Sequence, residues 1–187
     1  MRRFDVIQRV VNLVPAGTPV IANTGDPCKE LYCARDRQAN FYMLGSLGLA
    51  SSIALGLAIG LRGRRKVVAL DGDGAVLMNM GALTTLARYG RGNVIEVILD
   101  NCCYGSTGGQ PTATSCACDL AEVARACGIR AVHESRDMAS FEKSFLQAVT
   151  GNEDTVIVAY VSPETIECDN VALDGPEIRC RFMAALA

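Results

Sequence analysis

The sequence has few of the residues from which metal and nucleic-acid sites are commonly built. It contains a single histidine, His133, within a strand-like stretch, so a histidine-based metal site is not expected. No two cysteines show the C-x₂-C spacing that zinc and iron–sulfur sites normally repeat. Positive charge is not in excess either, because the formal net charge is -2, which argues against nucleic acid as the main partner.

An export signal is not expected either. The N-terminal residues Met1-Arg2-Arg3-Phe4 are not followed by the apolar segment that such a signal requires. The nine cysteines are an odd number, which does not suit a secreted disulfide framework. We therefore expect reduced, mostly buried thiols in a cytoplasmic protein.

No linker, repeat or low-complexity tract divides the chain, and its length suits one domain over residues 1–187. Residues 41–61 carry no charge and are long enough to cross a bilayer. Their glycines, serines and alanines favour a tightly packed buried helix instead. The short basic cluster over residues 62–66 is expected to be a solvated turn.

Strand-like and helical patterns alternate along the chain. Apolar residues at helical spacing predict a first helix over about residues 4–14. Short apolar runs predict strands at 19–23, 67–70, 94–99, 129–133 and 155–161, with helices at about 79–88, 120–127 and 138–149. Asp119 and Asp137 are the expected N-caps of the last two helices. This alternation predicts an α/β fold, a doubly wound parallel sheet with helices on both faces.

Two short polar motifs follow two of these strands. Gly72-Asp73-Gly74 follows the strand at 67–70, and Asp100-Asn101 follows the strand at 94–99. Because ligands bind at the carboxyl ends of strands in open α/β sheets, Asp73 and Asn101 are expected to lie side by side. Their oxygens suit Mg²⁺, which shares its ligands with phosphates, and the flanking glycines allow close approach of a phosphate. The motifs thus predict a metal–diphosphate site.

This pair of motifs resembles the signature of thiamine-diphosphate enzymes, a Gly-Asp-Gly followed at a similar distance by an Asn pair. Asp100 departs from that signature by replacing the first Asn, whereas Asn101, at the metal-ligand position, is intact. The resemblance implies a thiamine-diphosphate-binding fold with thiamine diphosphate and Mg²⁺ as cofactors. It also implies that Mg²⁺ would take the side chains of Asp73 and Asn101 and the backbone carbonyl of Cys103.

Further residues match the cofactor-binding positions of that family. Residues 40–52 resemble the turn that holds the aminopyrimidine ring, in which the Gly45 position offers its carbonyl and Ser46 adjoins it. The Leu47 position is the apolar wedge that bends the cofactor. Asp26 stands where relatives often carry a hydroxyl, and it would repel phosphate, so it is expected to point away or to act through its backbone. The positions implied to contact the diphosphate are Thr24, Gly25, Gly72, Gly74 and Ala75, and those implied to contact phosphate or substrate are Tyr104, Gly105 and Ser106.

The glutamate that activates the cofactor in this family belongs to a second domain, for which this chain has no room. The resemblance therefore implies half a site, completed by a separate pyrimidine-domain (alpha) subunit in a hetero-oligomer, and no catalytic residue is assigned on this chain. Residues 29–32, 41–46, 72–79 and 100–108 are similar to those of the small (beta) subunits of sulfopyruvate decarboxylases, which act in coenzyme M biosynthesis. That resemblance implies a carboxy-lyase that converts the 2-oxoacid sulfopyruvate into sulfoacetaldehyde and CO₂.

Three alternatives stay open at this point. Phosphonopyruvate decarboxylases share these motifs, although they are usually single longer chains. The beta subunits of 2-oxoacid:ferredoxin oxidoreductases carry a related run after the Asn pair, although many of them have clustered cysteines. A non-catalytic phosphate-binding partner module is the third. The group that binds the substrate's acid also stays open among Lys29, Arg35, Arg37, the loop at 107–112 and the partner.

Overall fold

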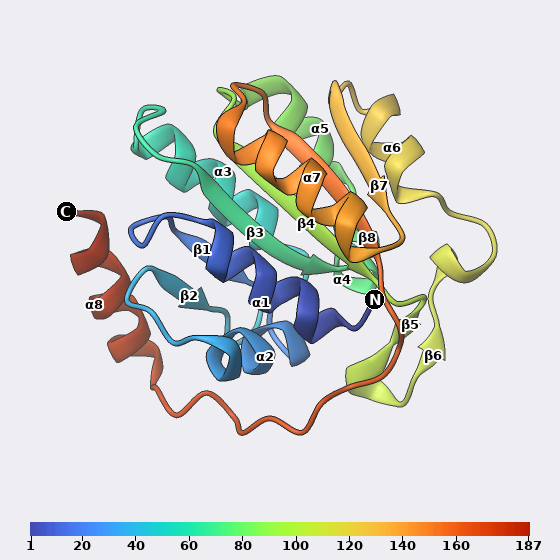
Figure 1. Cartoon of the computed structure of the whole chain (residues 1–187), viewed down its shortest axis with the longest axis horizontal. Helices are drawn as coiled ribbons and strands as arrows, with labels where there is room; N and C mark the ends of the chain where they lie inside the picture. The colour runs from blue at the N-terminus through green and yellow to red at the C-terminus, as the bar shows by residue number, and fades with distance from the viewer.

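A six-stranded parallel sheet forms the centre of the computed structural model, which describes all 187 residues (Figure 1). The strands lie in the order β2-β1-β3-β4-β8-β7, and every neighbouring pair is parallel. This confirms the predicted α/β fold. Their bounds are β1 (Val20–Ala22), β2 (Asn40–Tyr42), β3 (Val67–Gly72), β4 (Val94–Asp100), β7 (Ala131–Ser135) and β8 (Thr155–Tyr160).

Helices cover both faces of the sheet. In Figure 1, α1, α2 and α7 lie in front of the sheet, with α1 packed beside the other two, whereas α3 and α5 lie behind it. A small antiparallel pair, β5 (Cys103–Tyr104) and β6 (Gln110–Pro111), stands apart from the main sheet. The helix bounds are α1 (Arg3–Leu13), α2 (Asp26–Ala34), α3 (Ala50–Gly60), α4 (Asp73–Met78), α5 (Gly81–Tyr89), α6 (Leu120–Ala126), α7 (Met138–Thr150) and α8 (Gly175–Leu186).

The central strands are buried on both faces, as their sequences predict. All seven residues of β4 are buried, and so are the first five residues of β8. Strands of this kind read as nearly continuous hydrophobic runs rather than as an alternating pattern, because helices cover both sides of a parallel sheet. The two apolar strands β3 and β4 lie side by side and end together, so the motifs that follow them reach the same edge.

The uncharged segment at residues 41–61 is not one helix, which corrects the prediction. Its first residues complete β2, where Phe41 pairs with Ile21 of β1. Ser46 (φ 61°) and Gly48 (φ 81°) then adopt the left-handed conformation, which a right-handed helix cannot contain, and α3 begins only at Ala50. None of the helices has both the length and the apolar character needed to span a bilayer.

Four helices differ from the elements predicted by periodicity. The short helix α4 begins within the Gly72-Asp73-Gly74 motif, outside the helices predicted in this way, and α5 starts at Gly81 rather than near residue 79. Thr24-Gly25-Asp26-Pro27 has the sequence of a turn, but α2 begins within it, at Asp26. The C-terminal helix α8 was not predicted, although Asp174 caps it by accepting the backbone N–H of Glu177.

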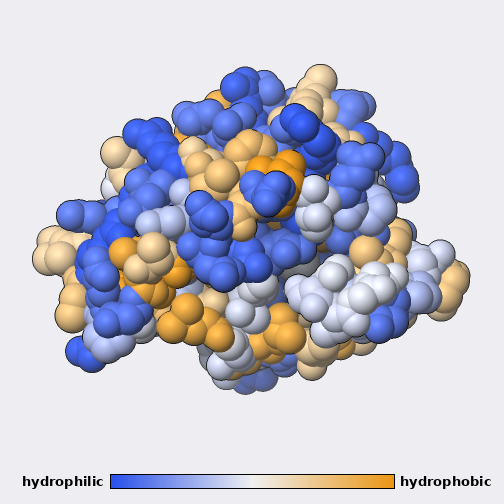
Figure 2. Space-filling view, turned by 90° about the horizontal axis from the view of Figure 1, so that it is seen from below, coloured by the Kyte–Doolittle hydropathy of each residue, from blue (hydrophilic) through white to orange (hydrophobic).

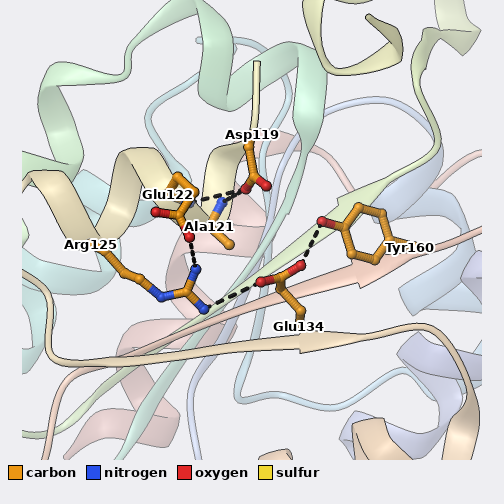
Figure 3. A network of polar contacts seen from close by, with 6 residues as sticks. All are labelled: Asp119, Ala121, Glu122, Arg125, Glu134 and Tyr160. Atoms are coloured by element: carbon orange, nitrogen blue, oxygen red, sulfur yellow. Dashed lines mark hydrogen bonds and ion pairs between the residues drawn. The ribbon is translucent and has the colours of Figure 1, made fainter. Parts of the chain in front are cut away.

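A polar network fastens α6 to the adjoining edge of the sheet (Figure 3). Asp119 caps the helix as predicted, by accepting the backbone N–H of Glu122 at 3.0 Å. The capping box is only half formed, because the Glu122 carboxylate bonds to Arg125 rather than returning to the cap. Arg125 also donates to Glu134 of β7 at 3.3 Å, and the Tyr160 hydroxyl of β8 donates to Glu134 at 3.1 Å.

Candidate functional site

A cavity of about 320 Å³ opens at the carboxyl ends of β1, β3 and β4. Asp73 and Asn101 both line it, so the structure brings together the two side chains on which the predicted site depends. This is the edge of an open α/β sheet at which ligands bind. The predicted site residues along the cavity are Thr24, Leu47, Gly72, Asp73, Gly74, Ala75, Asn101, Cys103, Tyr104, Gly105 and Ser106.

Asp73 is held by two hydroxyl groups from a loop far along the chain. Its side chain is buried, and its Oδ2 accepts from Thr112 Oγ1 at 2.6 Å and from Thr114 Oγ1 at 3.1 Å. Burial raises the pKa of the Asp73 carboxyl; the threonine hydrogen bonds lower it, whereas the negative charge of Asp100 raises it further. A carboxylate in this position gains from a nearby cation, because a cation offsets both the burial and the like charge.

Asn101 stands at a tight turn after β4. Its Oδ1 accepts the backbone N–H of Cys103 at 3.2 Å, while Asp100 Oδ1 accepts the backbone N–H of Cys102 at 3.0 Å. Cys102 itself is left-handed, with φ 59°. The turn therefore places the Asn101 carboxamide and Cys103 along the same cavity as Asp73.

The oxygen atoms available as metal ligands in this cavity suit a hard cation. No group of three or more His, Cys, Asp or Glu side chains gathers anywhere in the molecule in a way that could hold a metal ion. A cation in this cavity would have to combine the Asp73 carboxylate with amide and carbonyl oxygens. Oxygen ligands of this mixed kind, completed by phosphate and water, suit Mg²⁺. The residues present therefore fit a magnesium–diphosphate group.

The two glycines beside Asp73 serve different purposes. A Cβ at Gly74 would lie 2.5 Å from Cε1 of Tyr104, so the absence of a side chain makes room for the tyrosine ring. A Cβ at Gly72 would meet nothing within 4 Å. Only Gly72 thus has open space beside it, whereas Gly74 is needed for packing within the protein.

Leu47 is presented to the cavity by a turn that is pinned to the end of α4. Asn79 Nδ2 donates to the Gly48 carbonyl oxygen at 2.8 Å, and a Cβ at Gly48 would lie 2.8 Å from the Ala75 carbonyl oxygen. The Leu47 side chain is 47% exposed, which excludes ordinary core packing as its role. It lines the cavity together with Met78.

Three predicted residues do not line this cavity. Gly45 and Ser46 line a second cavity of about 430 Å³, which residues of α8 also border. Gly25 lies just behind the first cavity, since a Cβ on it would be 3.0 Å from Ser106 Oγ. Its φ of 94° gives this position a conformation that favours glycine.

Arg3 is a charged cavity residue that the sequence-based prediction missed. It lines the cavity although it is only 4% exposed. Its Nη2 lies 3.0 Å from Asp26 Oδ2 and 2.7 Å from Glu30 Oε1. The signal was present, because Arg3 shares its helix face with Ile7 and Val10, an unusual place for a cation in an apolar stripe.

The same ion pair revises the expectation for Asp26. Asp26 lines the cavity, and its carboxylate lies near Gly105 rather than turned fully away. Its charge is paired with Arg3, which reduces the repulsion that a phosphate would meet here. The other lining residues that were not predicted are Asn23, Pro27, Met78 and Leu99, whereas Thr107 belongs to the candidate loop at 107–112.

Comparison with known proteins agrees with this geometry. Residues 23–159 match the family model described as "Thiamine pyrophosphate enzyme, C-terminal TPP binding domain". The chain is 42% identical to the sulfopyruvate decarboxylase subunit beta of Methanocaldococcus jannaschii, over 99% of this chain and 97% of that one. It is 37% identical to the phosphonopyruvate decarboxylase of Streptomyces viridochromogenes, over 88% of this chain and 41% of that longer one.

Solved structures extend the likeness to the fold. Benzoylformate decarboxylase from Polynucleobacter necessarius superposes with a TM-score of 0.76 at 20% identity, over 89% of this chain and 34% of that one. The chain therefore belongs to the thiamine pyrophosphate enzymes, and within them to the beta subunits of sulfopyruvate decarboxylase. The family resemblance predicted from the motifs is confirmed.

Proposed function

We propose that this chain is the diphosphate-binding subunit of a thiamine-diphosphate-dependent enzyme that decarboxylates sulfopyruvate to sulfoacetaldehyde, as in coenzyme M biosynthesis. The observation that carries the proposal is the meeting of Asp73, Asn101 and Leu47 around one cavity. These residues come from three separate segments; in the family, the Asp73 and Asn101 positions hold the metal of the diphosphate and the Leu47 position bends the cofactor. We propose that residues 1–187 act as one diphosphate-binding domain in the cytoplasm.

Each side of the cavity has its own task in this proposal. Mg²⁺ would be held by the side chains of Asp73 and Asn101 and by the Cys103 carbonyl. Thiamine diphosphate, when bound, supplies the electron sink for the loss of CO₂. Leu47 would bend its ring end from the cavity wall, and Gly45 and Ser46, which line the second cavity, would hold the ring from the same turn. The diphosphate would lie against Thr24, Gly25, Gly72, Gly74, Ala75, Tyr104, Gly105 and Ser106, with Arg3 keeping the charge of Asp26 paired.

A partner subunit is needed because the cavity lacks one group. No glutamate lines it, whereas enzymes of this family use a glutamate to activate the cofactor. Large apolar side chains on and beside the cavity wall are also exposed, among them Leu44, Leu47 and Met78. Exposed apolar surface of this kind marks an interaction site. We propose that a pyrimidine-domain (alpha) subunit covers it and supplies the glutamate.

Apolar surface is not confined to that wall. On the face shown in Figure 2, hydrophobic patches lie between hydrophilic groups. The exposed apolar residues away from the cavity include Ile59, Tyr89, Leu146 and Met183. Scattered residues of this kind are normal on a folded protein, so the argument for a partner rests on the group beside the cavity.

The acid group of the substrate needs a cation or a set of amides. Arg3 is the single lysine or arginine along the cavity, and it is already paired with two carboxylates. Lys29, Arg35 and Arg37 do not line the cavity, whereas Thr107 of the candidate loop does. We propose that the partner supplies the cation that recognises the sulfonate.

Reconstitution tests the proposal. The isolated chain is expected to release no CO₂ from sulfopyruvate, and the complex purified with its pyrimidine-domain subunit is expected to release it in the presence of thiamine diphosphate and Mg²⁺. Phosphonopyruvate serves as the matched substrate, because faster turnover of phosphonopyruvate would favour the second candidate activity. Full activity of the isolated chain would refute the split site. A complex that binds no thiamine diphosphate would leave a non-catalytic module as the better description.

A further inference from the structure

Two threonine hydroxyls bond to one oxygen of the Asp73 carboxylate. Thr112 and Thr114 both contact Oδ2 of the carboxylate, at 2.6 and 3.1 Å, and neither bonds to Oδ1. Thr112 is buried, and its backbone N–H donates to the Cys102 carbonyl oxygen at 3.1 Å. The hydroxyl is therefore held in place by the loop that carries it. One oxygen of Asp73 is engaged by the protein, which leaves the other for a ligand.

Thr114 also links Asp73 to Asp100, the residue that departs from the family signature. Its hydroxyl lies 2.9 Å from Asp100 Oδ1 and 2.9 Å from Thr112 Oγ1. A hydroxyl has one proton to donate. With the Thr112 proton given to Asp73, the single proton of Thr114 has to serve either Asp73 or Asp100. A cation on Asp73 would draw its charge away and leave Thr114 free to donate to Asp100.

We propose that Thr112 and Thr114 are positioning residues for the cation. They fix the Asp73 carboxylate by Oδ2 so that Oδ1 is available to Mg²⁺, and Thr114 makes this arrangement tolerable beside Asp100. The inference rests on the proposed function, because it concerns the cation that the diphosphate would accompany. Hydrogen bonds that orient a metal ligand typically account for about 10–100-fold in metal affinity.

Titration of Mg²⁺ into the metal-free two-subunit complex, at fixed thiamine diphosphate, measures this effect by calorimetry. Thr112→Val and Thr114→Val keep the side-chain shape and remove the hydroxyl, so each is expected to raise the apparent Kd for Mg²⁺ by about 10–100-fold. Thr112→Ser restores the hydroxyl and should stay within about twofold of the wild type. Thr84→Val is the matched control, because the exposed Thr84 hydroxyl bonds only to the Gly81 carbonyl of its own helix.

The outcomes separate this inference from the proposed function. A wild-type complex that binds no thiamine diphosphate with Mg²⁺ would refute the proposed function itself. Wild-type Mg²⁺ affinity in both valine variants would refute the positioning role alone. If Thr112→Val does not fold, the Mg²⁺ affinity of Thr114→Val tests the positioning role, because Thr114 is only partly buried. Saturating Mg²⁺ should return cofactor affinity to within about twofold; a loss that persists would mean general damage and would also refute the role.

Discussion

Asp71 and Asp73 lie two residues apart, and both are buried, yet their surroundings differ in kind. Asp73 stands at the rim of the cavity, where two threonine hydroxyls bond to one of its oxygens. Asp71 lies inside the sheet and accepts only the backbone N–H of Gly72, at 3.1 Å. Its electrostatic neighbour on β4, Glu96, is fully buried, and neither of its carboxyl oxygens has a hydrogen-bond partner.

Burial raises the pKa of all three carboxyl groups, but the consequence differs. Burial raises the pKa of Asp71 to about 7 and that of Glu96 well above its ordinary value, to which the charge of Asp71 also contributes. The inner pair accepts only one backbone N–H and does not line the cavity, so burial favours its protonated form. Asp73 has two hydroxyl donors and faces the cavity, so its carboxylate can take a cation. The difference teaches that hydrogen-bond donors and access, rather than burial alone, separate a binding carboxylate from a structural acid.

Exchanging each aspartate for asparagine gives the largest expected contrast between the two positions. Asp73→Asn removes the charged ligand and should weaken Mg²⁺-dependent binding of thiamine diphosphate by at least about 100-fold, beyond the usual effect of an outer-shell change. Asp71→Asn removes an inner acid that touches no ligand and should change binding by less than about twofold. Calorimetry on the two-subunit complex measures both. Equal losses of thiamine diphosphate affinity in the two variants would contradict the distinction between the rim carboxylate and the interior acid.

Glu96→Gln tests the inner pair through the dependence of stability on pH. An acid whose pKa is raised by folding binds more protons in the folded state than in the unfolded state, so its stabilising effect is lost as pH rises toward the folded pKa. For Glu96 the window opens at its ordinary pKa of 4.5 and extends upward, because burial and the charge of Asp71 raise its folded pKa well above that value. From pH 4.5 to pH 7 the wild type should therefore lose more unfolding free energy than Glu96→Gln. Urea unfolding at each end of this range provides the comparison, and parallel curves for the two proteins would count against the buried acid pair.

Gly74→Ala tests whether the rim is as tightly packed as the interior. The added Cβ would lie 2.5 Å from the Tyr104 ring, so unfolding free energy is expected to fall by about 1–3 kcal/mol. Gly72→Ala is the control, because its Cβ would meet nothing and its φ of -95° is ordinary for any residue. That control should stay within about 0.5 kcal/mol of the wild type. Urea unfolding measures both variants. Equal stability of the two would mean that the structure around Gly74 adjusts to the added Cβ and that the rim is less tightly packed than the interior.

Cys102→Gly has the smallest expected effect and concerns strain at the rim. The left-handed conformation costs a non-glycine residue about 1–2 kcal/mol, and substitution by glycine relieves this strain. Part of the relief is offset because glycine has more conformational freedom in the unfolded state. A net stabilisation of about 0.5 kcal/mol is expected from thermal unfolding. Cys127→Gly, at a right-handed position with φ -71°, should shift the melting temperature in the opposite direction. A change in melting temperature of the same sign in both variants would show that Cys102 is not strained.

The strands and the Asp73–Asn101 meeting could be predicted because the information is local. Val67–Leu70 is a continuous apolar run, Val94–Leu99 is apolar apart from Glu96, and a polar motif follows each. Once both runs are parallel neighbours, the topology places the motifs together without any knowledge of side-chain contacts. Leu47 could be assigned only through the family resemblance, since its own pattern is also that of core packing.

The remaining parts depend on contacts between distant segments. Arg3 is bound to Glu30, 27 residues away, and Thr112 is bound to Asp73, 39 residues away, so no short window contains either pair. The strand β2 has only three residues, Asn40–Tyr42, and can be recognised only by its pairing with β1. The helix α4 has six residues and begins in a motif whose glycines argue against a helix.

The C-terminal helix α8 takes no part in the rim of the cavity, yet we expect it to limit aggregation of the protein. It lies beside β2 at the end of the strand order, where the Phe182 ring is 5.2 Å from the ring of Phe41 (Figure 1). A strand at the edge of a sheet offers unpaired backbone groups to any other chain it meets. A preparation shortened before residue 175 would thus retain every residue of the cofactor cavity and still tend to precipitate, through an edge that the helix normally shields.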